Sequence, residues 1–243
     1  MAKQKRIGMI AFGAVFCLLF GVPSLAATVN VGDSIKLDYA AYNTIWGGGA
    51  FKATDTNSGS IWTTFCLETT EFFSPGRTYK VDSVGFYAVG GGAGSADPPG
   101  TTSTSSAGTG DPISYQTAFL YDAFLNNLLN NTGAPGYDGT IGAQQKSLQM
   151  AFWYLENEIP KFSTSSYTSD ALANAYVQYA LDYAVTTYDY GVRVFNPVTY
   201  NSDGTVTKNQ SMLYQTVPEA GALLLFGTGL VGLVGYRRVR RMK

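Results

Sequence analysis

Histidine is absent from the 243-residue sequence, and cysteine occurs only twice. Without histidine, neither a Ser-His-Asp nor a Cys-His catalytic arrangement is possible, and no imidazole can bind a metal. Cys17 lies in a segment that we expect to be removed, which leaves Cys66 alone. A single cysteine excludes an intrachain disulfide and a thiolate metal cluster. We therefore expect no metal site, no cofactor, no catalytic residues and no enzymatic activity.

Basic residues are scarce between the two ends of the chain. Residues 27–216 hold 16 of the 17 acidic residues but only 8 of the 16 basic ones. An acidic region without a basic patch argues against nucleic acid as a partner. Its length suits one domain with a sizeable core, or one domain made of two subdomains.

The N-terminal segment has the three parts of a secretory signal peptide. Basic residues precede an uncharged apolar run over residues 7–22, and small residues follow. This pattern predicts a signal peptide over residues 1–26, cleaved between Ala26 and Ala27. The alternative, a retained membrane anchor, is disfavoured because the apolar run is short.

The C-terminal segment, residues 217–243, combines a short motif, an apolar run and a basic end. Val217, Pro218 and Glu219 precede an uncharged run over residues 220–236. As a helix this run is about 25 Å long, near the minimum for crossing a bilayer, so we expect a transmembrane helix. The last residues include five cations, which should stay on the cytoplasmic side: Arg237, Arg238, Arg240, Arg241 and Lys243.

This order of elements resembles the PEP-CTERM sorting segment of Gram-negative bacteria that produce exopolysaccharide. The resemblance implies transient insertion into the inner membrane and processing by an exosortase. The exported domain, residues 27–216, would then reach the cell surface or the extracellular matrix of a biofilm. The family motif usually has a second proline where this chain has Ala220. A plain C-terminal membrane anchor is the alternative.

The residue pattern of the exported region predicts strands, then helices, then strands. Alternating apolar residues between turn residues predict strands over 28–42, 46–53, 61–73 and 79–89. A low-complexity surface loop follows over 90–110. Helical periodicity covers 113–128, 143–158 and 169–186, with Asp111 as the first N-cap. A hairpin over 191–200 and 205–214 ends the domain. We therefore predict an α+β fold: a β-sandwich or barrel-like subdomain with an inserted three-helix subdomain.

Two short motifs single out Cys66 and Gln149. The first, Phe65-Cys66-Leu67-Glu68, lies in a predicted strand, and the second, LQMAFW over residues 148–153, lies in the second predicted helix. Gln149 and Trp153 are four residues apart and therefore share a helix face. Together the motifs resemble those of the thioester domains of bacterial surface adhesins.

That resemblance implies an internal thioester between Cys66 and Gln149. It would form by attack of the thiol on the side-chain amide with loss of ammonia, and would capture a nucleophile, usually an amine, on a surface. Phe65, Phe152 and Trp153 would exclude water from the bond. Glu68 would raise the pKa of a free thiol, or act as a base for the incoming amine. The expected partners are an extracellular polysaccharide or a surface amine ligand.

Two alternatives stay open. Cys66 could be a small buried apolar residue in a non-reactive structural or binding protein of the exopolysaccharide matrix. Paired carboxylates, such as Glu68 with Glu71 or Glu156 with Glu158, could serve a carbohydrate-active enzyme, but we expect them to be solvated. The tyrosines of the third predicted helix should belong to the core, although a face for sugar stacking is also open.

Overall fold

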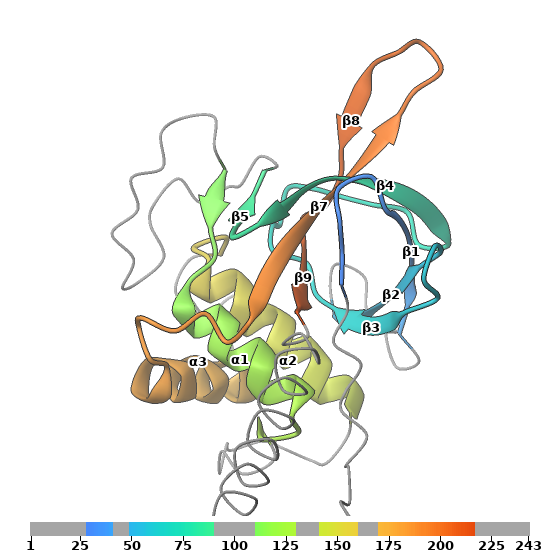
Figure 1. Cartoon of the computed structure of the whole chain (residues 1–243). Coiled ribbons are helices and arrows are strands. Elements are labelled where there is room, and N and C mark those ends of the chain that lie inside the picture. The colour runs from blue at the N-terminus through green and yellow to red at the C-terminus, as the bar shows by residue number, and fades with distance from the viewer. Residues whose placement is uncertain (1–27, 41–48, 90–109, 130–140, 160–169, 217–243) are drawn as a thin grey trace, which may run out of the picture.

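The computed structural model describes residues 28–40, 49–89, 110–129, 141–159 and 170–216. Within these residues a strongly curved, nearly closed barrel-like sheet lies beside three helices (Figure 1). The mixed α/β architecture agrees with the predicted barrel-like sheet and inserted helices. The predicted signal peptide and transmembrane helix, with nearly all of the 90–110 loop, lie outside the described residues.

The sheet is antiparallel, with strands in the order β3-β2-β1-β4-β7-β8 and with β9 also pairing with β7. Apolar side chains alternate along β1 and β2, so one face of each strand is buried, as the sequence predicted. The strands are β1 (Ser34–Tyr39), β2 (Phe51–Asp55), β3 (Ile61–Thr64), β4 (Arg77–Gly85), β7 (Val192–Tyr200), β8 (Val206–Lys208) and β9 (Met212–Gln215).

The segment after β3 closes the curved sheet against β9. Leu67 N donates to Ser211 O at 3.1 Å, and Leu213 N donates to Phe65 O at 3.3 Å. These bonds place Cys66 opposite Met212 in an isolated β-bridge. The predicted strand over 61–73 is therefore too long, because the chain leaves the edge of β2 after β3 and turns toward β9.

The final predicted strand, 205–214, is divided into β8 and β9. Both pair with the nine-residue β7, β8 along its second part and β9 along its first. The outer part of β7 and β8 form a hairpin that extends away from the barrel (Figure 1). One long strand thus has two successive partners, which residue periodicity within 205–214 does not reveal.

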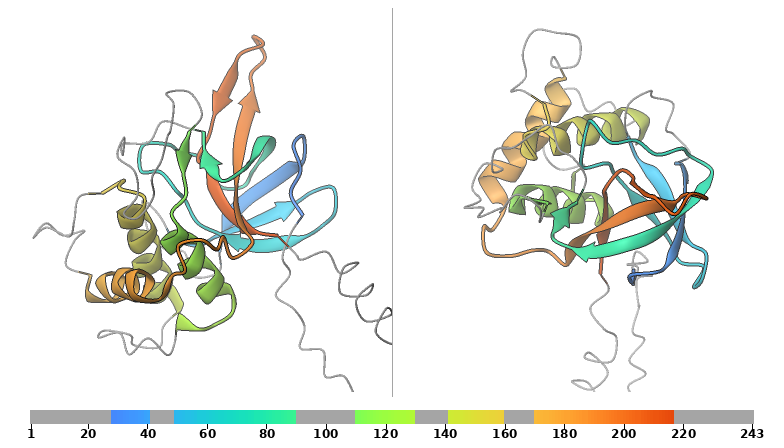
Figure 2. Two further views of the ribbon diagram at one scale, coloured as in Figure 1. Left: turned by 60° about the vertical axis from the view of Figure 1, so that its left-hand side comes forward. Right: turned by 90° about the horizontal axis from the view of Figure 1, so that it is seen from above.

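The three helices pack on one side of the barrel (Figure 2). They are α1 (Tyr115–Leu125), α2 (Ile141–Leu155) and α3 (Ala171–Tyr183). The predicted N-cap, Asp111, is wrong: Asp111–Pro112 forms the short strand β6, paired with β5 (Tyr87–Ala88). Ser114 caps α1 instead, since its side chain accepts a hydrogen bond from Thr117 N.

Two apolar cores meet at the seam between the segment after β3 and β9. Phe65 belongs to the core shared with the helices, whereas Cys66 belongs to the core inside the barrel. Adjacent residues of an extended chain face opposite sides, which explains this division. Cys66 therefore lies at the boundary between the barrel and the helices.

Candidate functional site at the barrel seam

The structure brings Cys66 and Gln149, the residues of the two motifs, into hydrogen-bond contact. The backbone N–H of Cys66 donates to Gln149 Oε1 at 3.0 Å, and Gln149 Nε2 donates to the Cys66 carbonyl oxygen at 2.7 Å. The two residues are separated by 83 positions in the chain. Both are buried, with only 1% of Gln149 and 5% of Cys66 exposed.

The course of the backbone explains why a carboxamide belongs here. The carbonyl of Phe65 and the N–H of Leu67 point toward β9 and pair with it. The N–H and C=O of Cys66 then point the other way, past the first residue of β2, Phe51, and both pair with the side chain of Gln149. Buried backbone groups require hydrogen bonds, and the amide of Gln149 supplies one donor and one acceptor.

Aromatic rings pack around Phe65, the neighbour of Cys66, in the core shared with the helices. Phe65 makes edge-to-face contacts with Tyr121, Phe124 and Phe152, with ring centroids 5.1 to 6.3 Å apart. Phe65 and Phe152 are completely buried. Phe65 and Phe152 therefore belong to a dry apolar core beside the barrel seam, and electrostatic interactions are stronger in such a core than in water.

Trp153 lies on the other side, in the barrel core together with Cys66. Its indole N–H is buried and has no hydrogen-bond partner. An unpaired buried N–H is energetically costly and is a donor available to an oxygen atom that approaches it. The sequence placed Trp153 near Gln149 but gave no indication of this unpaired donor.

The Cys66 thiol is held in its neutral form. Burial raises the pKa of this thiol far above its ordinary range. Cys66 is a free cysteine. The prediction that Glu68 would raise the thiol pKa is not supported, since burial alone accounts for the shift.

Glu68 is buried, and the prediction that it is solvated is wrong. It is 2% exposed, and neither of its carboxylate oxygens accepts a hydrogen bond in the described structure. Burial, reinforced by the charges of Glu71, Glu158 and Asp111, raises the pKa of Glu68 to about 8. Glu68, which lies two residues after Cys66, therefore changes its protonation state near neutral pH.

Glu158 is buried as well, because the segment after Cys66 folds onto the end of α2. Its Oε2 accepts hydrogen bonds from the backbone N–H and the hydroxyl of Thr69, both at 3.0 Å. The acidic and polar residues from Glu68 to Glu71 do not predict the contact between Thr69 and Glu158. These hydrogen bonds hold the segment that follows Cys66 against the end of α2, beside the site.

Glu156 makes a contact that the sequence did not predict. Its Oε1 accepts bonds from Ser114 N at 3.1 Å and Ser114 Oγ at 2.9 Å, joining the end of α2 to the start of α1. Burial raises the pKa of Glu156 to about 7, against the lowering effect of bonds from Thr117 and Ser114. The sequence pattern predicted a cap at Asp111 instead, and the bond between Ser114 and Glu156 is a tertiary contact that the local sequence does not reveal.

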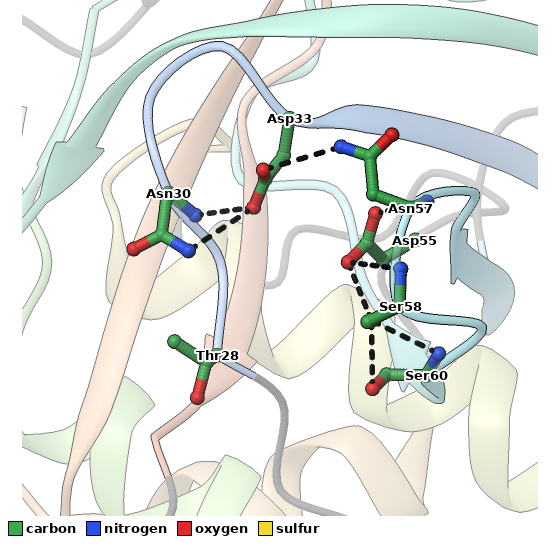
Figure 3. A pocket seen from close by; sticks show the side chains of 7 residues that line it. All are labelled: Thr28, Asn30, Asp33, Asp55, Asn57, Ser58 and Ser60. Carbon is green, nitrogen blue, oxygen red and sulfur yellow. Dashed lines mark hydrogen bonds between the residues drawn. The ribbon is translucent and has the colours of Figure 1, made fainter.

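A separate polar hollow lies at the β2–β3 turn (Figure 3). There Asp55 accepts bonds from Asn57 N at 2.9 Å and Ser58 N at 3.2 Å. Burial acts to raise the pKa of Asp55, but hydrogen bonds from Ser58 and Asn57 outweigh it and the pKa is lowered. The carboxylate is thus engaged in closing the turn, and this hollow is structural.

Within the described ranges, no three histidine, cysteine, aspartate or glutamate residues are grouped so that they could hold a metal ion. Nor is any helix in the described part of the chain both long and apolar enough to span a bilayer. The predicted span over 220–236 lies outside that part.

The C-terminal segment matches a known family model. The model for the PEP-CTERM protein-sorting motif covers residues 216–241. The chain ends in a PEP-CTERM sorting motif. The match includes Val217, Pro218 and Glu219 and the basic residues up to Arg241, and it holds despite Ala220 in place of the usual proline. A PEP-CTERM motif indicates exosortase-dependent sorting, with export through a membrane-anchored stage to the cell surface.

No curated protein and no solved structure matches the chain. The resemblance to thioester domains therefore gains no support from these comparisons. It rests on the Cys66 and Gln149 motifs themselves.

Proposed function

We propose that this PEP-CTERM protein attaches covalently to a surface or matrix component through a thioester between Cys66 and Gln149. The observation that carries the proposal is the pairing of the Gln149 carboxamide with the Cys66 backbone at a buried site between the two apolar cores. This pairing keeps the amide carbon close to the cysteine without help from a ligand. Proximity of this kind lowers the entropic part of a reaction barrier.

Thioester formation needs only these two side chains. Cys66 Sγ attacks Cδ of Gln149, the C–N bond breaks, and the nitrogen leaves as ammonia after taking up the thiol proton. The Cys66 N–H already donates to Oε1 and would stabilise the negative charge that develops on that oxygen. The raised thiol pKa favours a slow reaction, as expected for a step that occurs once in the life of the protein.

Capture of an amine ligand restores an amide at the Gln149 side chain. A primary amine attacks the thioester carbonyl, an amide forms at the Gln149 side chain, and the Cys66 thiol is released. The incoming amine must lose a proton, and Glu68, the carboxyl group closest to Cys66 in sequence, can accept it when ionised, near or above its pKa of about 8. Because the thioester is consumed, the protein acts as a single-use attachment device and not as an enzyme.

Labelling with deuterated methylamine tests the proposal. We expect one label per chain, located on the peptide that contains Gln149, with a maleimide-reactive thiol appearing at Cys66. Gln145, a second buried glutamine of α2, is the internal control and should stay unlabelled. Cys66→Ala should abolish labelling. Absence of label from the native chain would overturn the proposal.

The second candidate function is a non-reactive structural protein of the surface matrix. It is favoured by the same two hydrogen bonds, because they give Gln149 a structural role, and by the neutral, buried thiol. In that case the unfolded chain should present a free Cys66 thiol without any treatment with amine.

A further inference from the structure

Five aromatic rings form a continuous row on the helical side of the molecule. The row crosses α3, α1 and the segment that leads from α3 to β7. Successive ring centroids are 5.0, 5.2, 5.5 and 4.7 Å apart. In order, the members of this aromatic row are Tyr183, Tyr179, Phe119, Tyr190 and Tyr188.

The two ends of the row are exposed and the middle is anchored. Tyr183 is 65% exposed and Tyr188 is 57% exposed. Phe119, Tyr179 and Tyr190 are partly buried against the core that the helices share. The prediction that the tyrosines of α3 belong to the core is thus wrong at its C-terminal end. Exposed rings on an ordered apolar base are typical of binding surfaces.

The loop that carries Tyr188 is held in place by its neighbours. The backbone N–H of Val185 donates to the Tyr190 hydroxyl at 2.7 Å, and Gly191 N donates to Asp189 Oδ1 at 2.9 Å. Tyr190 adopts a positive φ of 54°, which turns the chain into β7. The end ring is thus presented by a loop fixed at several points.

The charges around the row restrict what can bind there. No lysine or arginine occurs in α1, in α3 or in residues 184–191, whereas Asp182 and Asp189 are present. Arg193 is the nearest cation in sequence, and it is ion-paired with Asp189 at 3.1 Å. These elements therefore present no unpaired cation, which disfavours an anionic polymer.

We infer that the aromatic row is a binding site for a neutral polysaccharide. Sugar rings have apolar C–H faces that stack on tyrosine, and their hydroxyls can bond to polar groups beside the row. Gln178 and Asp182, joined by a 2.8 Å bond on the exposed face of α3, supply such groups. The inference requires export of the chain but does not depend on the thioester.

Affinity electrophoresis of the full chain in mild detergent tests the inference. Native gels would contain hydroxyethylcellulose or dextran as neutral glucans, or alginate as a polyanion. We expect at least one neutral glucan to retard the chain and alginate to have no effect. The double variant Tyr183→Ala/Tyr188→Ala should bind about tenfold more weakly or worse, since it removes both stacking rings.

A matched control distinguishes binding at this site from non-specific binding. Tyr39 and Tyr200 are 58% and 63% exposed on the barrel side, so Tyr39→Ala/Tyr200→Ala should bind like the native chain. Tyr183→Trp/Tyr188→Trp should retain binding, since it keeps an aromatic ring at both positions. No retardation by either neutral glucan, retardation by alginate alone, or equal retardation of the alanine variant would overturn the inference.

Self-association provides the remaining test. If size-exclusion chromatography shows a dimer that the Tyr183→Ala/Tyr188→Ala variant loses, the row binds a second copy and the inference is wrong. Methylamine labelling of the same variants should be unchanged. Failure of glycan binding and failure of the thioester can therefore be told apart.

Discussion

The side chain of Gln149 pairs with the peptide of Cys66 as a neighbouring strand would. Oε1 and Nε2 take the positions of a backbone carbonyl and a backbone N–H, at 3.0 and 2.7 Å. The helix α2 thereby supplies the hydrogen-bond partner of the Cys66 backbone, next to the start of β2 at Phe51. The same arrangement serves the closure of the barrel and the proposed chemistry.

Replacing Gln149 by alanine should destabilise the protein by about 3 kcal/mol, because two buried backbone groups of Cys66 lose their partners. Urea unfolding followed by tryptophan fluorescence measures this change. Gln178→Ala, which removes an exposed glutamine, should change the free energy of unfolding by no more than about 0.5 kcal/mol. Equal effects of the two substitutions would contradict the structural role of Gln149.

Stability should fall as the pH rises. The pKa of Glu68 is raised from an ordinary 4.5 to about 8, so the folded state binds a proton that the unfolded state has lost between these values. The protonated carboxyl group of Glu68 contributes its full stabilisation below the pKa that it has in the unfolded state. This stabilisation is lost as the pH rises through the pKa that it has in the folded state. Glu156, with a pKa of about 7, acts in the same direction.

Thermal melts from about pH 5 to about pH 9 measure this effect. Glu68→Gln should raise the melting temperature at the alkaline end and flatten the profile, leaving the smaller slope due to Glu156. A native melting temperature that increases toward alkaline pH would be inconsistent with a buried Glu68.

Ser114→Ala should cost about 1 to 2 kcal/mol, since the hydroxyl both caps α1 and donates to Glu156. Ser202→Ala, in the exposed turn between β7 and β8, is the control and should be close to neutral. Chemical denaturation compares the two variants. The prediction is wrong if Ser114→Ala is as stable as the control.

Substitution of Val217, Pro218 and Glu219 by alanine should prevent processing of the exported chain. Exosortase-dependent sorting requires recognition of the motif, so the unprocessed protein should accumulate in the membrane fraction. Immunoblots of membrane and surface fractions follow this change. Alanine substitutions in the exposed turn at Ser202 and Asp203 provide the control and should leave surface localisation unchanged.

Local patterns in the sequence predicted much of the fold. Alternation along β1 and β2, and helical periodicity in α2 and α3, arise from burial of one face and can be read from residue order. The limits of β3 depend on the bridge between Cys66 and Met212, which are far apart in the chain, whereas the division of β8 from β9 depends on which part of β7 each strand pairs with. Asp111 and Ser114 are both good capping residues, and only the pairing of β6 with β5 decides between them.

The candidate site could likewise be predicted only in part. The motifs around Cys66 and Gln149 identified two residues that the fold places in contact. The burial of Glu68 and the anchoring of Thr69 by Glu158 escaped prediction, since carboxylates are usually exposed and these are covered by tertiary packing. Likewise, the aromatic row joins rings from three separate segments, of which the sequence showed only the α3 part.

The intact mass of the exported chain tests the central claim most directly. With a thioester between Cys66 and Gln149, the native chain should be lighter than its sequence by one ammonia, and Cys66→Ala should show no such deficit. Methylamine should add its full mass to the native chain. A chain of full mass whose thiol reacts completely with maleimide after unfolding would contradict the thioester.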